Sequence, residues 1–168
     1  DELVELLEAD RGLILLCGRD GATRVVNARA RGRALNAYER EEISKTIIHQ
    51  VQWSGNSVFW EPEVETIGTE SMAALGILSA IAAPLQTLWH RAEDQSARAC
   101  GALYVDFRDY RKNIGDDHRE LVEAAAAMVA VVLDQSQRLE ASEARLRDRE
   151  ARDVTVEAAP TLDELLVY

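Results

Sequence analysis

The chain has 168 residues, of which 47% are hydrophobic, and this is enough for one globular unit with a buried core. Its formal charge is −11, from 30 acidic and 19 basic residues, which argues against a surface that neutralises nucleic-acid phosphates. No stretch approaches the roughly eighteen uninterrupted apolar residues of a membrane-spanning helix, and the start DELVELLEAD is acidic where a signal peptide would be basic. We expect a soluble, cytoplasmic protein that neither binds nucleic acid directly nor enters a membrane.

The first third of the chain predicts a helix tail, a β-hairpin and a second helix. DELVELLEADRG has its leucines on one helical face and ends at Gly12. The apolar run LILLC and the alternating run ATRVVNARA flank the turn GRDG, a pattern typical of a hairpin. Apolar residues then recur every three to four positions from Ile43 to Val51, which predicts one helix from about Glu39 to Trp53.

The middle of the chain predicts a short strand, a loop with a brief helix, and a second hairpin. NSVFWEP is the strand, and ETIGTESMAALG is the loop leading into a helix that ends at Gly76. ILSAIAAPLQTLWH and ARACGALYVDF bracket a polar insert and are expected to pair. Pro84 cannot donate a hydrogen bond to a neighbouring strand, so it should lie at an edge or a bulge.

A long helix is predicted from Asp116 to about Glu150, because no Gly or Pro interrupts it. A seven-residue spacing of apolar residues continues into its charged second half, which favours a parallel coiled coil and a homodimer; a single solvated helix that frays after about Arg138 is the alternative. The expected dimer helix residues are Leu121, Met128, Val132, Leu139 and Leu146. Residues 151–168 are interpreted as a linker into an output domain of a longer polypeptide.

This order of elements indicates an α+β domain with five or six mostly antiparallel strands. The succession of ADRGLILLC, ISKTIIHQVQWSGNSVFW, SMAALGILSAIAAPL, GALYVDF and the last helix resembles the GAF-domain family over about residues 3–140. The resemblance implies a PAS-related three-layer fold with the terminal helices on one face of the sheet and the middle helices and loops on the other. It also implies a sensory domain over residues 1–140 of a bacterial signalling protein. The segment APTLDELLVY is similar to the stretch that leads into the AAA+ ATPase of sigma-54-dependent activators.

Within the GAF resemblance, a ligand would lie between the sheet and the middle helices and loops. The candidate pocket residues are Phe59, Trp60, Glu65, Ile67, Ser71, Met72, Leu75, Ser79 and Ile81. Trp60 and Met72 are equally typical of ordinary core packing. The ligand is not identified, because no counterpart of the NKFDE-like motif of cyclic-nucleotide GAF domains is found, and no cysteine has the adjacent histidine that often marks covalent bilin attachment.

Other functions remain as alternatives. One is a purely structural dimerisation module whose pocket is filled by its own side chains. Another is a thiol redox sensor that uses Cys17 and Cys100, because the resemblance places them on neighbouring antiparallel strands. An enzyme and a metal site are not expected, since no nucleophile lies beside a base and the three histidines do not cluster with acids.

Overall fold

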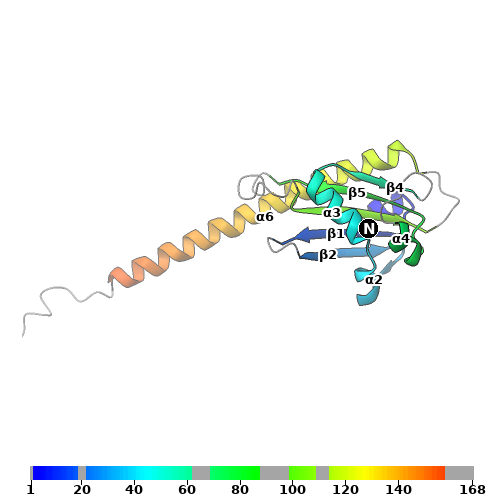
Figure 1. Ribbon diagram of the computed structural model, residues 1–168. Coiled ribbons are helices and arrows are strands. Elements are labelled where there is room, and N and C mark those ends of the chain that lie inside the picture. The colour runs from blue at the N-terminus through cyan, green and yellow to red at the C-terminus, as the bar shows by residue number, and fades with distance from the viewer. Residues whose placement is uncertain (1, 19–21, 62–68, 88–98, 109–113, 158–168) are drawn as a thin grey trace, which may run out of the picture. The chain divides into compact units, whose positions relative to one another are not determined.

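A computed structural model describes residues 2–18, 22–61, 69–87, 99–108 and 114–157, with the backbone alone for 69–71 and 150–157. The chain divides into two compact units, Asp1–Val131 and Val132–Tyr168, which are described separately. The strands are β1 (Arg11–Cys17), β2 (Thr23–Ala30), β3 (Arg33–Ala34), β4 (Val58–Trp60), β5 (Ser79–Leu85) and β6 (Gly101–Phe107). The helices are α1 (Glu2–Leu6), α2 (Ala37–Glu41), α3 (Lys45–Ser54), α4 (Thr69–Ala74) and α6 (Asp116–Glu157) (Figure 1).

The described strands form one antiparallel sheet in the order β3-β2-β1-β6-β5-β4. Both predicted hairpins are confirmed, since β1 pairs with β2 and β5 pairs with β6. The two hairpins join in the centre, where β1 pairs with β6 from Arg11 opposite Asp106 to Leu16 opposite Gly101. Residues at the two ends of the domain sequence therefore lie side by side in the middle of the sheet.

One face of the sheet packs against the middle helices. Alternate strand residues point to this face, including Leu13 and Leu15 of β1 and Tyr104 of β6, all at most 1% exposed. The helix α3 buries its apolar stripe on them through Ile47, Ile48 and Val51, and α4 adds Met72. This layer is the main hydrophobic core.

The opposite face packs against α1 and the first part of α6 (Figure 1). Gly12 of β1 lies beneath α1, since a Cβ built at Gly12 would come within 2.7 Å of Val4 Cγ2. On this side Val105 and Phe107 of β6 are fully buried, as is Val122 of α6. The expected α+β three-layer arrangement, with terminal helices on one face and middle helices on the other, is confirmed.

The single helix predicted over 39–53 is wrong, because the chain forms two helices with a break at Glu42–Ser44. Each helix has its own start. Asn36 caps α2 in a reciprocal capping box with Glu39, and the Ser44 side chain accepts a hydrogen bond from the Ile47 amide at the start of α3. The two-residue strand β3 was not predicted at all.

Pro84 was expected at an edge or a bulge, and it lies on β5 beyond the end of the neighbouring strand β4. It is paired with Ala102 of β6, but β4 reaches only as far as Ala82 of β5, so Pro84 has one strand neighbour. The long helix extends past the predicted end to Glu157, so the first residues of the predicted linker are helical. The reason is that no Gly or Pro follows until Pro160.

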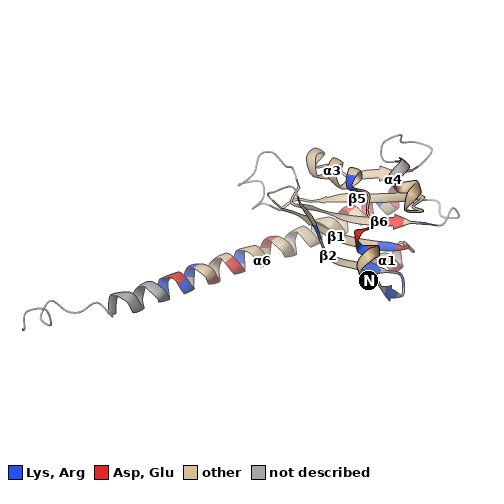
Figure 2. Cartoon of the chain, turned by 60° about the horizontal axis from the view of Figure 1, so that its bottom comes forward, with Lys and Arg blue, Asp and Glu red and all other residues tan. Residues whose placement is uncertain are grey.

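The described part of the second unit is the continuation of α6. Acidic and basic residues alternate along it (Figure 2), and pairs four residues apart join Arg138 to Asp134 at 2.8 Å and Arg147 to Glu143 at 3.2 Å. Leu139 and Leu146 are 62% and 54% exposed on this helix. Among the described residues, no helix is both long enough and apolar enough to cross a membrane.

Candidate functional site

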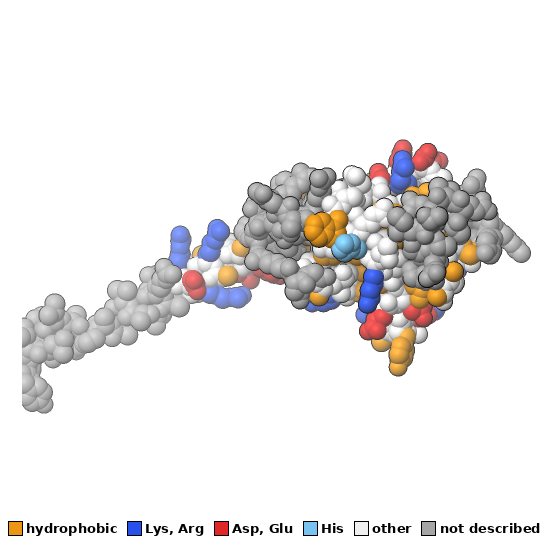
Figure 3. All heavy atoms as spheres, viewed as in Figure 1, with side chains coloured by type: hydrophobic (Ala, Val, Ile, Leu, Met, Phe, Trp, Pro, Cys, Tyr) orange, Lys and Arg blue, Asp and Glu red, His pale blue; other side chains and the backbone are white. Residues whose placement is uncertain are grey.

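The first unit contains a cavity of about 810 Å³ between β2, α2 and α3. It lies on the α3 side of the sheet. This helix covers β4, β5 and β6, while the cavity borders the outer strand β2. Figure 3 views this side of the molecule, where hydrophobic, basic and histidine side chains share the surface. A concave space of this size with a mixed lining is typical of small-molecule sites.

The helix α3 forms one wall of the cavity with residues spaced along a single helical stripe. Lys45, His49 and Gln52 border the cavity at positions i, i+4 and i+7, and buried Ile48 contributes an apolar surface beside them. The Trp53 indole N–H donates to Nε2 of His49 at 2.6 Å, which fixes the imidazole at the rim. The helix ends at Gly55, whose φ of 69° suits glycine.

The other walls come from α2 and β2. The helix α2 contributes Arg40 and Glu41, and β2 contributes Arg24 and half-buried Val25. Counting all lining residues, three basic side chains face one acidic side chain, whereas the whole chain has a charge of −11. The cavity is thus locally basic in an acidic protein.

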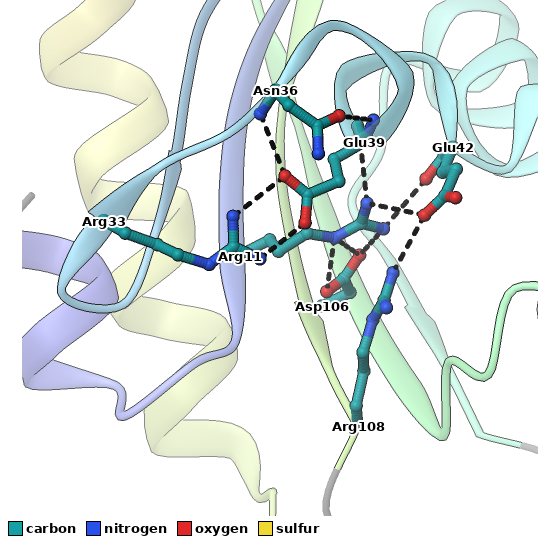
Figure 4. A network of polar contacts seen from close by, with 7 residues as sticks. All are labelled: Arg11, Arg33, Asn36, Glu39, Glu42, Asp106 and Arg108. Carbon is teal, nitrogen blue, oxygen red and sulfur yellow. Dashed lines mark hydrogen bonds and ion pairs between the residues drawn. The ribbon is translucent and has the colours of Figure 1, made fainter.

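The position of α2 depends on Arg11, which lies under it at the start of β1 (Figure 4). Arg11 Nε donates to both carboxylate oxygens of Asp106 at 3.1 and 2.9 Å. Its terminal nitrogens donate to the backbone carbonyls of Glu39 and Glu42, both at 2.8 Å. Because these carbonyls belong to α2 and to the residue that caps its C-terminus, one buried side chain holds the cavity wall on the central strands.

Acidic and basic groups around Arg11 extend this network. Glu42 also meets Arg108 at 3.4 Å, and Glu39 pairs with Arg33 (Figure 4). The hydrogen bonds from Arg33 and from the Asn36 amide lower the pKa of Glu39 from 4.5 to about 2. Burial acts to lower the pKa of Arg11, but hydrogen bonding and charge attraction to Asp106 outweigh it, so that pKa lies above its usual value. Both residues are therefore held in their charged forms.

Tyr104 lies beside this network on β6, with its side chain in the core. Its hydroxyl is buried, lies near Asp106, and has no hydrogen-bond partner among the residues that the structure describes. Burial, together with the Asp106 charge, raises the pKa of Tyr104 well above its ordinary value. As far as the described residues show, the hydroxyl is thus a neutral polar atom inside the domain without a hydrogen bond.

No family model matches the chain, and no curated protein matches it. Solved structures do. The chain is similar to the phycoerythrobilin-bound GAF domain of a cyanobacterial phytochrome, with a TM-score of 0.57 and 17% identity over 83% of each chain. The chain has the GAF fold. A far-red cyanobacteriochrome photoreceptor gives a TM-score of 0.58 and 21% identity, over 80% of this chain and 81% of that one. A domain of a protein described as a two-component sensor histidine kinase from Sinorhizobium meliloti 1021 gives 0.57 and 21%, over 86% and 90%.

The GAF fold separates the pocket residues that the sequence grouped together. Trp60 and Met72 are at most 1% exposed and lie in the core under α3, with Leu75 packed against them. Phe59 and Ile81 are paired across β4 and β5 on the opposite face, and Ser79 follows the same alternation. Glu65 and Ile67 lie outside the described residues, and only the backbone of Ser71 is described.

The cavity of this GAF fold is therefore lined by residues that the sequence analysis did not select. One signal was available: Lys45, His49 and Gln52 form a polar stripe on a helix that also has an apolar stripe. Nothing in the sequence showed that β2 would lie across from this stripe. The described residues contain no group of three or more His, Cys, Asp or Glu that could hold a metal ion.

Cys17 and Cys100 lie opposite each other at the ends of β1 and β6. The Cys17 amide donates to the Cys100 carbonyl at 2.8 Å, and neither cysteine is in a disulfide. Burial raises the pKa of the Cys17 thiol, and the Cys100 thiol donates to the Leu85 carbonyl at 3.0 Å. Both observations favour protonated thiols, which react slowly with oxidants.

Proposed function

We propose that this chain is a regulatory sensory module of a bacterial signalling protein. It binds a small molecule in the cavity between β2, α2 and α3, and it forms a homodimer through α6. The observation that carries the proposal is the cavity of about 810 Å³ on the middle-helix side of the GAF fold, with apolar and polar groups on one wall. A guest that binds one conformation more tightly than another would shift the population toward it.

Contacts of the first unit support a route from the cavity to α6. The helix α2 lines the cavity and is bonded to Arg11, and Arg11 is bonded to Asp106 of β6. The next residue, Phe107, packs edge-on against His118 in the first turn of α6, with ring centroids 6.3 Å apart. A movement of α2 could thus reach α6 through the Arg11 hydrogen bonds, one step along the backbone of β6 and the contact between Phe107 and His118.

Exposed apolar side chains on α6 support the homodimer. Met128 and Val132 are 66% and 60% exposed, and Leu139 and Leu146 repeat the pattern further along. Val132, Leu139 and Leu146 are spaced seven residues apart and Met128 precedes Val132 by four, as expected for positions at the seam of a parallel coiled coil. Burial of these side chains against a second copy would remove them from water.

For the output domain, we propose mainly the class of protein to which it belongs. Similarity to sensor-kinase domains supports an attached signalling domain after α6. A sigma-54-dependent AAA+ ATPase remains our more specific proposal, on the resemblance of APTLDELLVY alone. We also propose a cytoplasmic location and no catalytic activity for this chain.

Two measurements on the 168-residue chain test the module. Sedimentation velocity should show a dimer, and a screen of metabolites by thermal shift, followed by calorimetry, should find compounds that stabilise the protein. Stabilisation should be lost in Ala37→Trp, which fills the cavity from an exposed position on α2. A monomer that no compound stabilises would contradict the proposal. A dimer whose cavity accepts nothing would favour the structural dimerisation module.

A further inference from the structure

The charges of the cavity point to the chemistry of its guest. We propose that the cavity takes an organic anion, with an apolar body against Val25, Ile43 and Ile48 and an acidic group held by Arg24, Arg40 and Lys45. This inference rests on the proposed function, because it specifies the ligand class of the same cavity.

The three basic side chains come from three different elements around one hollow. Arg24 is on β2, Arg40 is in the last turn of α2, and Lys45 is in the first turn of α3. All three are exposed, and none makes a side-chain hydrogen bond or ion pair with the residues that the structure describes. In contrast, Arg11 and Arg108 each meet a carboxylate. The cations around the cavity thus retain their capacity to bind an anion.

The apolar part of the cavity lining indicates that the guest also has an apolar body. Ile48 is 2% exposed, and Val25 and Ile43 are half-buried at the edge of the main core. An inorganic ion would leave this surface in water, whereas an organic acid would cover it. The single acidic side chain, Glu41, disfavours a second negative group on its side and thus selects a guest with one acidic end.

A matched pair of dyes tests the anion inference directly. Anilinonaphthalene sulfonate carries an acidic group, and phenylnaphthylamine has the same aromatic skeleton without it. Fluorescence titration of the folded chain should give tighter binding of the sulfonate than of the neutral dye, and added salt should weaken only the sulfonate. The double variant Arg40→Gln, Lys45→Gln should weaken sulfonate binding about fivefold or more and leave the neutral dye unchanged.

Control variants separate the two proposals. Arg31→Gln removes an exposed arginine that does not line the cavity and should change neither dye. Ala37→Trp, with Gln52→Trp as a second filling variant, should weaken both dyes. Suppose that the filling variants weaken the binding of both dyes. The cavity site then stands, but the anion inference is overturned if the sulfonate binds no more tightly than the neutral dye. It is also overturned if the Arg40→Gln, Lys45→Gln variant binds the sulfonate as tightly as wild type does. If neither filling variant changes either dye, the cavity site itself is overturned.

Discussion

Arg11 and Asp106 form a buried ion pair between the two central strands of the sheet. Their side chains are 4% and 0% exposed, and Arg11 Nε lies within 3.1 Å of both carboxylate oxygens. The remaining Arg11 donors bind carbonyls of Glu39 and Glu42. The pair therefore joins β1, β6 and the end of α2 in one set of contacts.

Asp106→Ala should strongly destabilise the domain. It leaves the Arg11 guanidinium buried without its carboxylate, and loss of one partner of a buried pair costs about 3–5 kcal/mol. Urea unfolding monitored by circular dichroism measures this. The control Arg33→Ala removes an arginine whose side chain is 57% exposed from its pair with Glu39 and should cost much less stability than Asp106→Ala. Equal losses would show that the buried pair has no special role.

Gly101→Ala should separate β6 from β1. A Cβ at Gly101 would lie 2.0 Å from the Leu15 carbonyl oxygen, which belongs to the backbone of the paired strand and cannot move alone. We expect a loss of at least about 2 kcal/mol in the free energy of unfolding. Gly12→Ala is the matched control, because its Cβ would meet only the end of the Val4 side chain. The glycine at the start of GALYVDF is thus required by a close backbone approach.

The sheet and its layers could be predicted because their signals are local and repeated. The short apolar runs in LILLC and GALYVDF mark buried strands, and turn sequences separate the strands of each hairpin. The same alternation already places Phe59 and Trp60 on opposite faces, since they are neighbours in one strand. The prediction that Phe59 and Trp60 line the same pocket therefore disregarded the two-residue period of a strand.

The cavity could not be predicted, because its shape depends on where α2 lies. That position is set by Arg11 donating to two backbone carbonyls, and a backbone acceptor has no signature in the sequence. The break before α3 likewise depends on Ser44, which caps a new helix instead of continuing α2. A serine can occupy either position, so the residue type alone does not predict the break. Ile43 and Ile47 keep helical spacing across that break, which concealed it.

Tyr104→Phe should leave the domain as stable as wild type or stabilise it by up to about 1 kcal/mol. Its buried hydroxyl has no partner among the described residues, so removal deletes an unsatisfied polar group and leaves the ring in place. Thermal and urea unfolding measure the difference. A loss above about 1 kcal/mol would mean that the hydroxyl is hydrogen-bonded in solution, for instance to a buried water.

Acid should weaken the domain partly through Glu39. Its pKa falls from 4.5 to about 2 on folding, so its contribution is complete above pH 4.5 and is lost as the pH falls toward 2. Glu39→Gln keeps a side chain able to serve the capping box but has no titrating group. Urea unfolding at several pH values across this window should therefore show a smaller loss of stability for Glu39→Gln than for wild type. If the free energy of unfolding falls equally with pH in both proteins, the lowered pKa does not belong to Glu39.

Leu139→Asp should weaken the homodimer. Leu139 is 62% exposed and lies seven residues from both Val132 and Leu146, at a position expected in the seam of the coiled coil. A carboxylate there would face its own copy in a parallel pair, so burial would place two like charges together. Ala144→Asp is the control, because Ala144 lies on the opposite side of the heptad and is exposed. Sedimentation velocity over a concentration series should show a larger dissociation constant for Leu139→Asp alone, while circular dichroism shows unchanged helix content. If both variants remain dimers of equal affinity, the copies associate through another surface and α6 is not the dimer helix.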